Sequence, residues 1–275
     1  MAGALETAGR VLLVGGGNMG GAMLRGWLEA GLDPAAVAVL DPNGAPLLAD
    51  IVSRGVRLAA APAEVERGAD TVILAVKPQV MEAVLPTLLP LLADDTLIVS
   101  VAAGRTVASI EAALGERPVV RAMPNTPALV NRGITGAYPN ARVTGPMRAR
   151  AQALLESSGP VEWVEREALI DAVTGVSGSG PAYVFLLAEA LAEAGVAAGL
   201  DPALAMRLAR HTVAGAGELM IRSGDEPAQL RRNVTSPNGT TQAALEILMA
   251  DDGFGPLLRR AVLAARDRAE ALSRA

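Results

Sequence analysis

The residues best suited to bind a small acidic molecule form the run Ser236-Pro237-Asn238-Gly239-Thr240-Thr241. Pro237 stiffens the approach and Asn238-Gly239 is a strong turn signal, so a helix is expected to begin at the two threonines. Free backbone N–H groups at a helix N-terminus attract an anion such as a carboxylate. One threonine hydroxyl is expected to cap the helix, which leaves the other for a ligand. The run also fits an ordinary capped helix after a loop, so the rest of the chain must decide.

A glycine-rich stretch, Gly15-Gly16-Gly17-Asn18-Met19-Gly20, follows the apolar run Val11–Val14 and opens a helical pattern. Gly15, Gly17 and Gly20 have the spacing G-x-G-x-x-G after a strand and before a helix, as a dinucleotide-binding turn requires. The first glycine makes the tight turn, the second lets the backbone approach a pyrophosphate, and the third allows close packing of helix on strand. The sequence therefore predicts a nicotinamide dinucleotide site at residues 15–20.

Asp41 ends the next apolar run, about 20 residues after Gly20. An acidic residue at this place can take the ribose 2′-OH of NAD, and its charge would repel the 2′-phosphate of NADP. The sequence after it, Pro42-Asn43-Gly44, is turn-like, so Asp41 can equally be read as a turn residue. From the first interpretation we expect NADH to be used at least as well as NADPH.

Two further loops are expected at the carboxyl ends of strands, where ligands gather in sheets of this kind. One contains Ala75-Val76-Lys77-Pro78 and the other contains Ala102-Ala103. We expect their small side chains and backbone amides to contact the ribose and nicotinamide. Plain strand-end loops would have the same composition, so neither loop decides the matter alone.

The composition excludes several classes of protein. A chain of 275 residues with 51% hydrophobic residues fits one large or two ordinary domains with an ample core. The net charge of −5, without a basic stripe and with only 2% aromatic residues, argues against a nucleic-acid partner. The absence of cysteine removes disulfides, thiolate nucleophiles and soft metal sites, and it fits a reducing, cytoplasmic setting. Residues 1–9 lack the features of a secretory signal and are predicted to be a disordered tail.

The first part of the chain, residues 1–166, alternates apolar runs with helical patterns. The runs are rich in Val, Ile and Leu without alternation, as strands covered on both faces should be. This rhythm predicts an α/β fold with a Rossmann-like, doubly wound parallel sheet. The predicted strands are Val11–Val14, Val37–Leu40, Thr71–Val76, Leu97–Val101 and Val119–Arg121.

Residues 167–275 show only helical patterns and are predicted to form an all-α domain. The apolar stretch Pro181–Leu200 is interrupted by Glu189 and Glu193, so we expect a buried helix and no membrane span. A domain of this size has little to cover such a helix, and although the first domain could do so, we favour a homodimer through the helical half. The predicted helices lie near 167–175, 179–198, 202–223, 241–250 and 254–272.

From about Arg10 to its C-terminal helix, the chain resembles the pyrroline-5-carboxylate reductases, which catalyse the last step of proline biosynthesis. The resemblance is specific because its later blocks are not general features of dinucleotide-binding domains. It implies an NADH- or NADPH-binding domain, a helical dimerisation domain, and dimers that often assemble into larger rings. The blocks that carry it are Gly15–Gly20, Ala75–Pro78, Ser100–Gly104, Arg121–Ala128, Gly175–Tyr183 and Asn233–Thr241.

The resemblance also assigns roles to residues. It implies that Thr241 hydrogen-bonds the ring nitrogen of the substrate, 1-pyrroline-5-carboxylate, and that backbone amides of Gly239–Thr241 hold its carboxylate, helped by Ser236. It places Asn233 between cofactor and substrate, and Ser177 along the same cleft. The protonated C=N bond accepts hydride readily, so catalysis needs good positioning and no strong enzymic acid. This agrees with a chain that has no cysteine and one histidine.

One position departs from the family pattern. The family usually has Gly-Gly after Ser-Pro, and here the first glycine is Asn238. Asparagine tolerates a positive φ better than most residues, so we expect the turn to survive. The Asn238 amide could reach the substrate and alter affinity or selectivity.

Three other functions use a similar plan. The β-hydroxyacid dehydrogenases need a lysine in the helical domain, but the sole lysine, Lys77, lies in the first half. Ketol-acid reductoisomerase holds magnesium with helical carboxylates, which leaves only Glu189 and Glu193 as candidates. A nucleotide-sensing protein without turnover would not need the Ser236–Thr241 turn. The lone His211 is expected to be a packing or surface residue, and no metal site is predicted.

Overall fold

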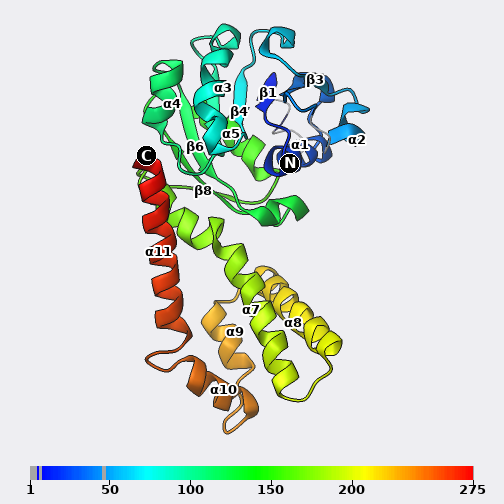
Figure 1. Ribbon diagram of the computed structural model, residues 1–275, viewed down its shortest axis with the longest axis vertical. Helices are drawn as coiled ribbons and strands as arrows, with labels where there is room; N and C mark the ends of the chain where they lie inside the picture. The colour runs from blue at the N-terminus through cyan, green and yellow to red at the C-terminus, as the bar shows by residue number, and fades with distance from the viewer. Residues whose placement is uncertain (1–4, 6–7, 45–47, 275) are drawn as a thin grey trace. The chain divides into compact units, whose positions relative to one another are not determined.

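The computed structural model describes residue 5 and residues 8–44 and 48–274. The chain divides into two compact units, the first running to Gly178 and taking in the end of the chain from Ala265, the second comprising Ser179–Ala264. Figure 1 labels many of the helices and strands, numbered in chain order. These units are not the two segments, 1–166 and 167–275, expected from the sequence. The division at residues 166 and 167 marks the place where the sequence pattern changes from alternating strands and helices to helices alone, and it stays a prediction.

The first unit contains one eight-stranded sheet in the order β3-β2-β1-β4-β5-β6-β7-β8. Neighbouring strands are parallel except for the antiparallel pair β6 and β7. The order reverses between β1 and β4, which is where such sheets bind dinucleotides. The strands are β1 (Val11–Val14), β2 (Val37–Leu40), β3 (Arg57–Ala59), β4 (Thr71–Leu74), β5 (Leu97–Ser100), β6 (Val119–Met123), β7 (Thr135–Pro139) and β8 (Val161–Trp163).

All five predicted strands are present, two with the predicted bounds and three with one end shifted by one or two residues. The sequence analysis missed β3, β7 and β8. β3 and β8 have three residues each and alternate or expose their side chains, so they lack an apolar run. β7 carries both a glycine and a proline, which weaken a strand signal. Strands of this kind, of which β3 and β8 lie at the two edges of the sheet, are defined by their neighbours more than by their own composition.

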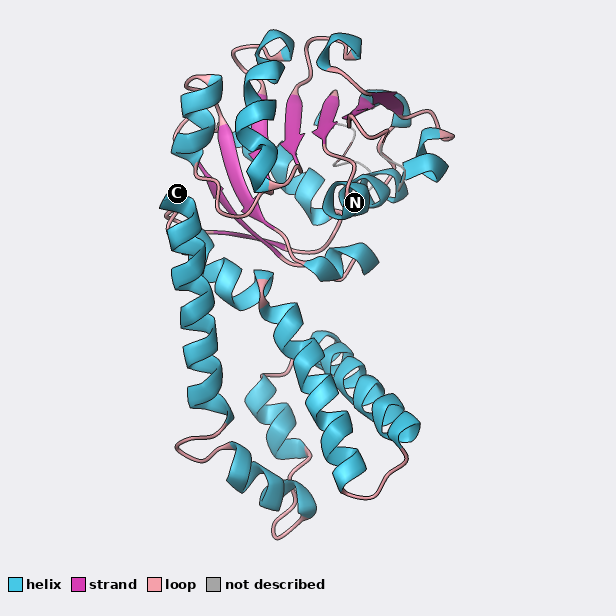
Figure 2. Ribbon diagram, in the orientation of Figure 1, coloured by secondary structure: helices cyan, strands magenta, loops and turns pink. Residues whose placement is uncertain are grey.

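Helices pack on both faces of the sheet, and Figure 2 shows them against its magenta strands. The helices are α1 (Asn18–Glu29), α2 (Ala49–Val52), α3 (Met81–Leu88), α4 (Val107–Leu114) and α5 (Gly145–Glu156), with short 3-10 turns η2 (Pro34–Ala36), η4 (Pro62–Glu64), η5 (Pro78–Val80), η6 (Leu89–Leu91) and η7 (Thr126–Val130). Alternate residues of β1 enter different cores, because successive side chains of a strand point to opposite faces. Val11 and Leu13 belong to the core that contains Trp27 of α1, whereas Leu12 and Val14 belong to the core that contains Leu85 of α3.

A buried polar cluster holds the last turn of the chain against the first unit. The Arg121 guanidinium on β6 donates to Asp171 Oδ1 at 2.8 Å, to Glu167 Oε1 at 3.2 Å and to Ser273 Oγ at 3.2 Å. Glu167 Oε1 also accepts the backbone N–H of Val107, at the start of α4. The cluster therefore links four elements, and its charges are compensated as buried ions require.

After β8 the described chain is entirely helical, as predicted. The elements are α6 (Leu169–Val173), a π-helical turn η8 (Thr174–Gly178), α7 (Gly180–Ala197), α8 (Pro202–Ser223), α9 (Pro227–Asn233), α10 (Thr240–Leu248) and α11 (Phe254–Arg274). Helix α9 was not predicted, because it is only seven residues long. The α7–α8 pair approaches closely where a Cβ on Gly195 would lie 3.2 Å from the Cβ of Ala205.

The second unit, which the structure describes in full, has almost no apolar core of its own. Its buried apolar side chains are three alanines: Ala192, Ala205 and Ala209. Phe185 and Leu186 on α7 are 61% and 62% exposed. The expectation that this helix is buried is therefore wrong for the single chain. The cause is that α8 covers only the small-residue face of α7.

The stretch Leu169–Ala197 is long and apolar enough to cross a membrane by length and composition. A single stretch of this kind is weak evidence, since helices of soluble proteins also meet the criterion.

The predicted disordered tail, residues 1–9, is partly contradicted. Leu5 and Ala8 are buried against the core that contains Trp27. The backbone N–H of Arg10 donates to Asp70 Oδ2 at 2.7 Å. The sequence analysis compared this segment only with a secretory signal. It did not consider that two apolar side chains can anchor a segment to the core. The rest of the tail, residues 1–4, 6 and 7, lies outside the described residues.

Candidate functional site

The glycine-rich stretch forms the turn between β1 and α1, as predicted. Gly15 has φ +101°, a conformation that favours glycine, and a Cβ there would lie 2.8 Å from the Ala75 carbonyl oxygen. A Cβ on Gly20 would lie 2.1 Å from the Gly15 carbonyl oxygen. Nothing lies within 4 Å of the place a Cβ would occupy on Gly17. The first and third glycines are therefore required by packing, and the second leaves the turn open to an approaching ligand.

The start of α1 is suited to a pyrophosphate. Gly17 is the N-cap residue and has no side-chain cap, and no acidic residue lies in the first turn. The first intrahelical bond runs from the Gly21 N–H to the Gly17 carbonyl, which leaves the N–H groups of Asn18, Met19 and Gly20 without a helical acceptor. Such groups, with the positive end of the helix dipole, bind phosphate. The residues present thus fit a dinucleotide.

Asp41 lies at the carboxyl end of β2 and contacts the glycine-rich turn directly. Its Oδ2 accepts the backbone N–H of Gly16 at 2.8 Å, and its Oδ1 accepts the N–H of Asn43 at 2.9 Å. The second bond is the turn interaction that the sequence left open. The first is a contact across 25 residues that fixes the carboxylate beside the turn. The turn interpretation of Asp41 is therefore confirmed. The contact with a ribose stays a prediction, for which lone pairs remain on each carboxylate oxygen.

The two predicted strand-end loops lie at the same edge of the sheet. The N–H of Ala75 donates to the Val14 carbonyl at 2.8 Å, and the N–H of Val101 donates to the Leu74 carbonyl at 3.0 Å. Ala75–Pro78 therefore lies beside the glycine-rich turn, and Ala102-Ala103 follows on the next strand. Val76 and Lys77 belong to the same loop, with Lys77 exposed. The predicted cofactor residues thus line one continuous edge formed by β2, β1, β4 and β5.

A residue that the sequence analysis missed joins these loops. The Arg105 guanidinium, which follows β5, donates to the Pro78 carbonyl oxygen after β4 through Nε at 3.2 Å and Nη2 at 2.8 Å. Its Nη1 lies 3.2 Å from Glu82 Oε1. No spacing rule points to this arginine, because its partner is a backbone atom 27 residues away.

Helix α1 is also braced from the side. Arg25 on α1 donates to Asp50 on α2, with Nη2 3.0 Å from Oδ1. The hydrogen bond from the Arg25 guanidinium lowers the pKa of the Asp50 carboxyl below its usual range. The pair is solvent-exposed, so it contributes little to the free energy of folding, although it connects α2 to α1.

The second predicted site, Ser236–Thr241, forms a turn and the start of α10 within the second unit. Helix α10 begins at Thr240 with Gly239 as the N-cap, and no side chain caps it. The expectation that a threonine hydroxyl caps the helix is therefore wrong, because the cap position falls one residue earlier, on Gly239. Among the described residues, the hydroxyls of Thr240 and Thr241 have no hydrogen-bond partner. The backbone N–H groups of the first turn are likewise free for an anion.

Asn238 preserves the turn as expected. It adopts the left-handed conformation with φ +57°. The N–H of Gly239 donates to the Ser236 carbonyl at 3.0 Å, and a Cβ on Gly239 would lie 2.5 Å from Ser236 Oγ. The second glycine of the family pattern is therefore needed for space, whereas the first position requires only a residue that tolerates positive φ.

Gln242 completes this turn and was also missed. Its Oε1 accepts the N–H of Asn238 at 2.8 Å, and its Nε2 donates to Glu246 Oε1 at 3.0 Å. A glutamine three residues after an N-cap is a known capping signal, which could have been found in the sequence. Gln242 accepts the N–H of Asn238, which precedes the helix, so the N–H groups of the first turn keep no side-chain acceptor.

The remaining predicted substrate residues are spread along the chain. Asn233 ends α9, where its Oδ1 accepts from Gln229 Nε2 at 2.6 Å. Ser177 lies in η8, and its Oγ donates to the Val173 carbonyl at 3.0 Å. Asn233, Ser236 and Gly239–Thr241 belong to the second unit, whereas Ser177 and all the predicted cofactor residues belong to the first. The grouping of the two sets into one cleft stays a prediction.

The alternative candidates gain little from the geometry. His211 is exposed on α8, and Glu189 and Glu193 are exposed on α7. No group of three or more His, Asp or Glu within the described ranges is placed to hold a metal ion.

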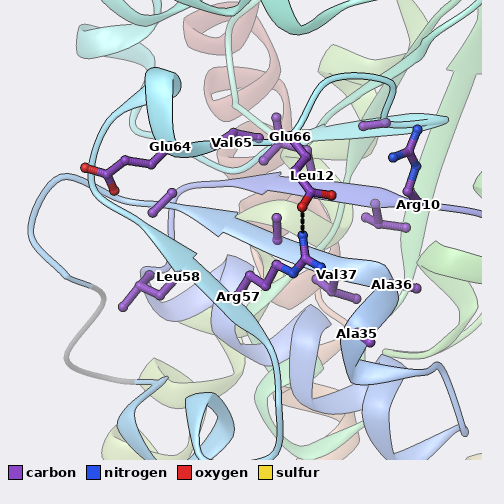
Figure 3. A pocket seen from close by; sticks show the side chains of 14 residues that line it. Arg10, Leu12, Ala35, Ala36, Val37, Arg57, Leu58, Glu64, Val65 and Glu66 are labelled. Atoms are coloured by element: carbon purple, nitrogen blue, oxygen red, sulfur yellow. Dashed lines mark ion pairs between the residues drawn. The ribbon is translucent and has the colours of Figure 1, made fainter.

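A pocket near the first residues of β1, β2 and β3 lies at the opposite edge of the sheet (Figure 3). Arg57 forms an ion pair with Glu66 there. Ligands of doubly wound sheets bind at the carboxyl ends of strands, so this pocket is not the nucleotide site.

Two family models match the chain. Residues 10–104 match the model described as NADP oxidoreductase coenzyme F420-dependent, and residues 167–272 match the model described as pyrroline-5-carboxylate reductase dimerisation. The first match spans the glycine-rich turn and both strand-end loops. The second spans the exposed apolar helices and the α10 turn.

Full-length relatives agree with these matches. The pyrroline-5-carboxylate reductase of Pseudomonas aeruginosa is 46% identical over 266 residues, covering 96% of this chain and 97% of that protein. A solved pyrroline-5-carboxylate reductase from Coxiella burnetii has a TM-score of 0.91 at 36% identity, covering 97% of this chain and 99% of that one. A Plasmodium falciparum pyrroline carboxylate reductase, solved with NADP bound, has a TM-score of 0.80 at 29% identity, covering 96% and 98%. With its fold, its glycine-rich turn and its α10 turn in place, this chain belongs to the pyrroline-5-carboxylate reductase family.

Proposed function

We propose that this protein is an NAD(P)H-dependent pyrroline-5-carboxylate reductase, which reduces 1-pyrroline-5-carboxylate to L-proline in the last step of proline biosynthesis. The observation that carries the proposal is the start of α10, where uncapped N–H groups and two unpartnered threonine hydroxyls are free for a ligand. A cyclic imine with a carboxylate matches this combination, because the anion suits the helix N-terminus and the ring nitrogen suits a hydroxyl.

The cofactor is held by the carboxyl edge of the sheet in the first unit. The N–H groups of Asn18, Met19 and Gly20 receive the pyrophosphate, and Asp41 faces the ribose next to the adenine. Ala75–Pro78 and Ala102-Ala103 contact the second ribose and the nicotinamide. When bound, the reduced nicotinamide supplies a hydride to the imine carbon. A relative solved with NADP bound supports the choice of a nicotinamide dinucleotide as cofactor.

The substrate is oriented by the α10 turn. The free N–H groups of Thr240 and Thr241 bind the carboxylate, and Ser236 stands beside them. The N–H of Gly239 was expected to share this role, but it donates to the Ser236 carbonyl. The Thr241 hydroxyl hydrogen-bonds the ring nitrogen, which keeps its proton through the reaction and becomes the amine of proline. Asn233 and Ser177 contribute to the walls of the same site. The chain's contribution to the rate is the positioning of the imine carbon, since an iminium needs no further activation.

Cofactor selectivity follows from Asp41. Its carboxylate is fixed by the N–H groups of Gly16 and Asn43, so it cannot readily turn away from a 2′-phosphate. We therefore maintain that NADH is used at least as well as NADPH.

The functional assembly we propose is a homodimer through the helical unit, with a ring of dimers as a further stage. The match to a dimerisation model and the exposed apolar side chains of α7 support this. A cytoplasmic location is part of the same proposal, because reduction by NAD(P)H draws on the reduced cofactor pool of the cell.

The experiment that tests the function is the loss of NADH or NADPH absorbance on adding pyrroline-5-carboxylate, in parallel reactions. We expect rapid oxidation with proline as the product. Binding of either cofactor without oxidation would contradict the proposal and favour a nucleotide-sensing protein or another imine substrate.

A further inference from the structure

The two cofactor loops after β4 and β5 are joined by one side chain, Arg105. Both loops are short, and Ala75, Val76 and Ala102 pack on the cores beneath them, whereas Lys77 beyond them is exposed. Arg105 follows the second loop directly and makes two hydrogen bonds to the Pro78 carbonyl oxygen of the first, at 2.8 and 3.2 Å. The side chain is only 22% exposed. An arginine with both donors on one carbonyl has a fixed direction as well as a fixed distance.

The Pro78 carbonyl is well placed to transmit this restraint. It also accepts the N–H of Met81, which closes the η5 turn at the end of the first loop. Arg105 therefore restrains the residue next to Lys77, within the segment that the proposed function assigns to the cofactor. On the other side, Gly104 has φ +71°, and a Cβ there would lie 3.1 Å from the Leu272 Cβ of α11. The backbone before Arg105 is thus held close to α11, and the guanidinium connects it to the Pro78 carbonyl of the first loop.

We propose that Arg105 is a positioning residue for the dinucleotide: it sets the spacing between the loops Ala75–Pro78 and Ala102-Ala103 and so the affinity for the ribose–nicotinamide half of NAD(P)H. This inference rests on the proposed function, because it concerns the cofactor site of that reaction. Arg105 does not itself contact the reacting atoms in this proposal. Glu82 holds the outer side of the guanidinium but is 81% exposed, so it is a minor partner.

The chain offers a matched control at the opposite edge of the same sheet. Arg117, which precedes β6, donates to the Leu114 carbonyl at 2.8 Å and to the Ala93 carbonyl at 3.2 Å. It has the same chemistry as Arg105 and bonds the same kind of acceptor. Because it lies at the amino end of the strands, its loss should disturb stability without reaching the cofactor loops.

The test measures the Kd for NADH and NADPH by isothermal titration calorimetry in the full-length protein, with kcat and KM in parallel. Arg105→Met should raise both Kd values by about 5- to 30-fold through the loss of two hydrogen bonds. The kcat at saturating cofactor should stay within about twofold, because Arg105 does not contact the reacting atoms in this proposal. Arg105→Lys, which keeps one donor toward Pro78, should give an intermediate Kd. Glu82→Gln and Arg117→Met should leave Kd within about twofold.

Equal Kd values for Arg105→Met and Arg117→Met would overturn the inference and leave the proposed function standing. If Arg105→Met does not fold, a wild-type Kd in Arg105→Lys together with a lowered Tm would overturn it in the same way. A wild-type protein that binds neither dinucleotide would overturn the inference and the proposed function together.

Discussion

At the scale of single residues, the site depends on polar groups whose partners are backbone atoms. Asp41 accepts two backbone N–H groups, and Arg105 donates twice to one carbonyl. Thr241 is the exception, because its hydroxyl is free in the described chain. A free hydroxyl beside uncapped N–H groups is the arrangement expected of a residue kept for a ligand.

Replacing Thr241 tests that assignment. Thr241→Ala should lower kcat/KM for pyrroline-5-carboxylate by about 5- to 150-fold, because a buried hydrogen bond worth about 1–3 kcal/mol is lost in the transition state. Thr240→Ala is the matched control: it removes a hydroxyl from the same turn but keeps the backbone N–H that the proposal uses. Steady-state kinetics with both variants decide the matter. Equal effects would remove any special role for Thr241.

Replacing Asp41 tests the origin of cofactor preference. Asp41→Asn keeps the shape and one acceptor but removes the charge that faces the ribose. The ratio of kcat/KM for NADPH to that for NADH should rise by roughly 5- to 30-fold, as the loss of one close repulsion predicts. Values of kcat/KM for the two cofactors provide the measurement. An unchanged ratio would show that Asp41 serves only to brace the turn between Gly16 and Asn43.

At the scale of elements, both proposed sites are helix N-termini prepared by a glycine-containing turn. Helix α1 follows Gly15–Gly17, and α10 follows Asn238-Gly239, and neither helix has a side-chain cap. An uncapped start is unfavourable for a helix alone, since its first N–H groups lack acceptors. Each turn therefore leaves a helix N-terminus open to an anion. Binding of the anion offsets the free-energy cost of the uncapped helix start.

The αL conformation of Asn238 gives a test of the second turn. Asn238→Gly should leave KM for the substrate and Tm nearly unchanged, because glycine adopts φ +57° without strain. Asn238→Ala should destabilise the turn by about 1–2 kcal/mol and raise KM, because a Cβ without a polar side chain is disfavoured there. Kinetics and thermal melts of the pair separate the backbone effect from any contact of the amide. A rise in KM for Asn238→Gly as well would assign the amide to substrate binding.

At the scale of the whole molecule, the two units differ in how they are stabilised. The first has cores on both faces of its sheet, whereas the second buries only alanines and exposes large apolar side chains along α7. A unit of this kind cannot be stable from its own burial, because hydrophobic burial is the main favourable contribution to folding. The dimerisation model that matches residues 167–272 supports the proposal that a second copy of the chain covers these side chains.

Charge reversal of the apolar surface tests the dimer. Leu186→Glu should shift the protein from dimer, or a multiple of it, to monomer in light scattering at micromolar concentration, because an unpaired carboxylate would be buried in the contact. Leu89→Glu, at a 43% exposed leucine of η6 in the first unit, is the control and should leave the mass unchanged. NADH binding should survive in both variants. A Leu186→Glu protein of wild-type mass would place the contact elsewhere.

The sequence by itself determined the dinucleotide turn, five strands and the α10 turn, because each depends on residues within one local stretch whose backbone needs are set by glycine, proline or apolar runs. The tertiary structure alone decided which long-range partners those stretches find. The hydrogen bond between Asp41 and Gly16, the reach of Arg105 to Pro78 and the strands β3, β7 and β8 have no local signal, since their partners are backbone groups brought close by the sheet. The burial of α7 was expected from its composition. Whether a helix is buried depends on the surfaces around it, and in the single chain the large apolar side chains of α7 are exposed.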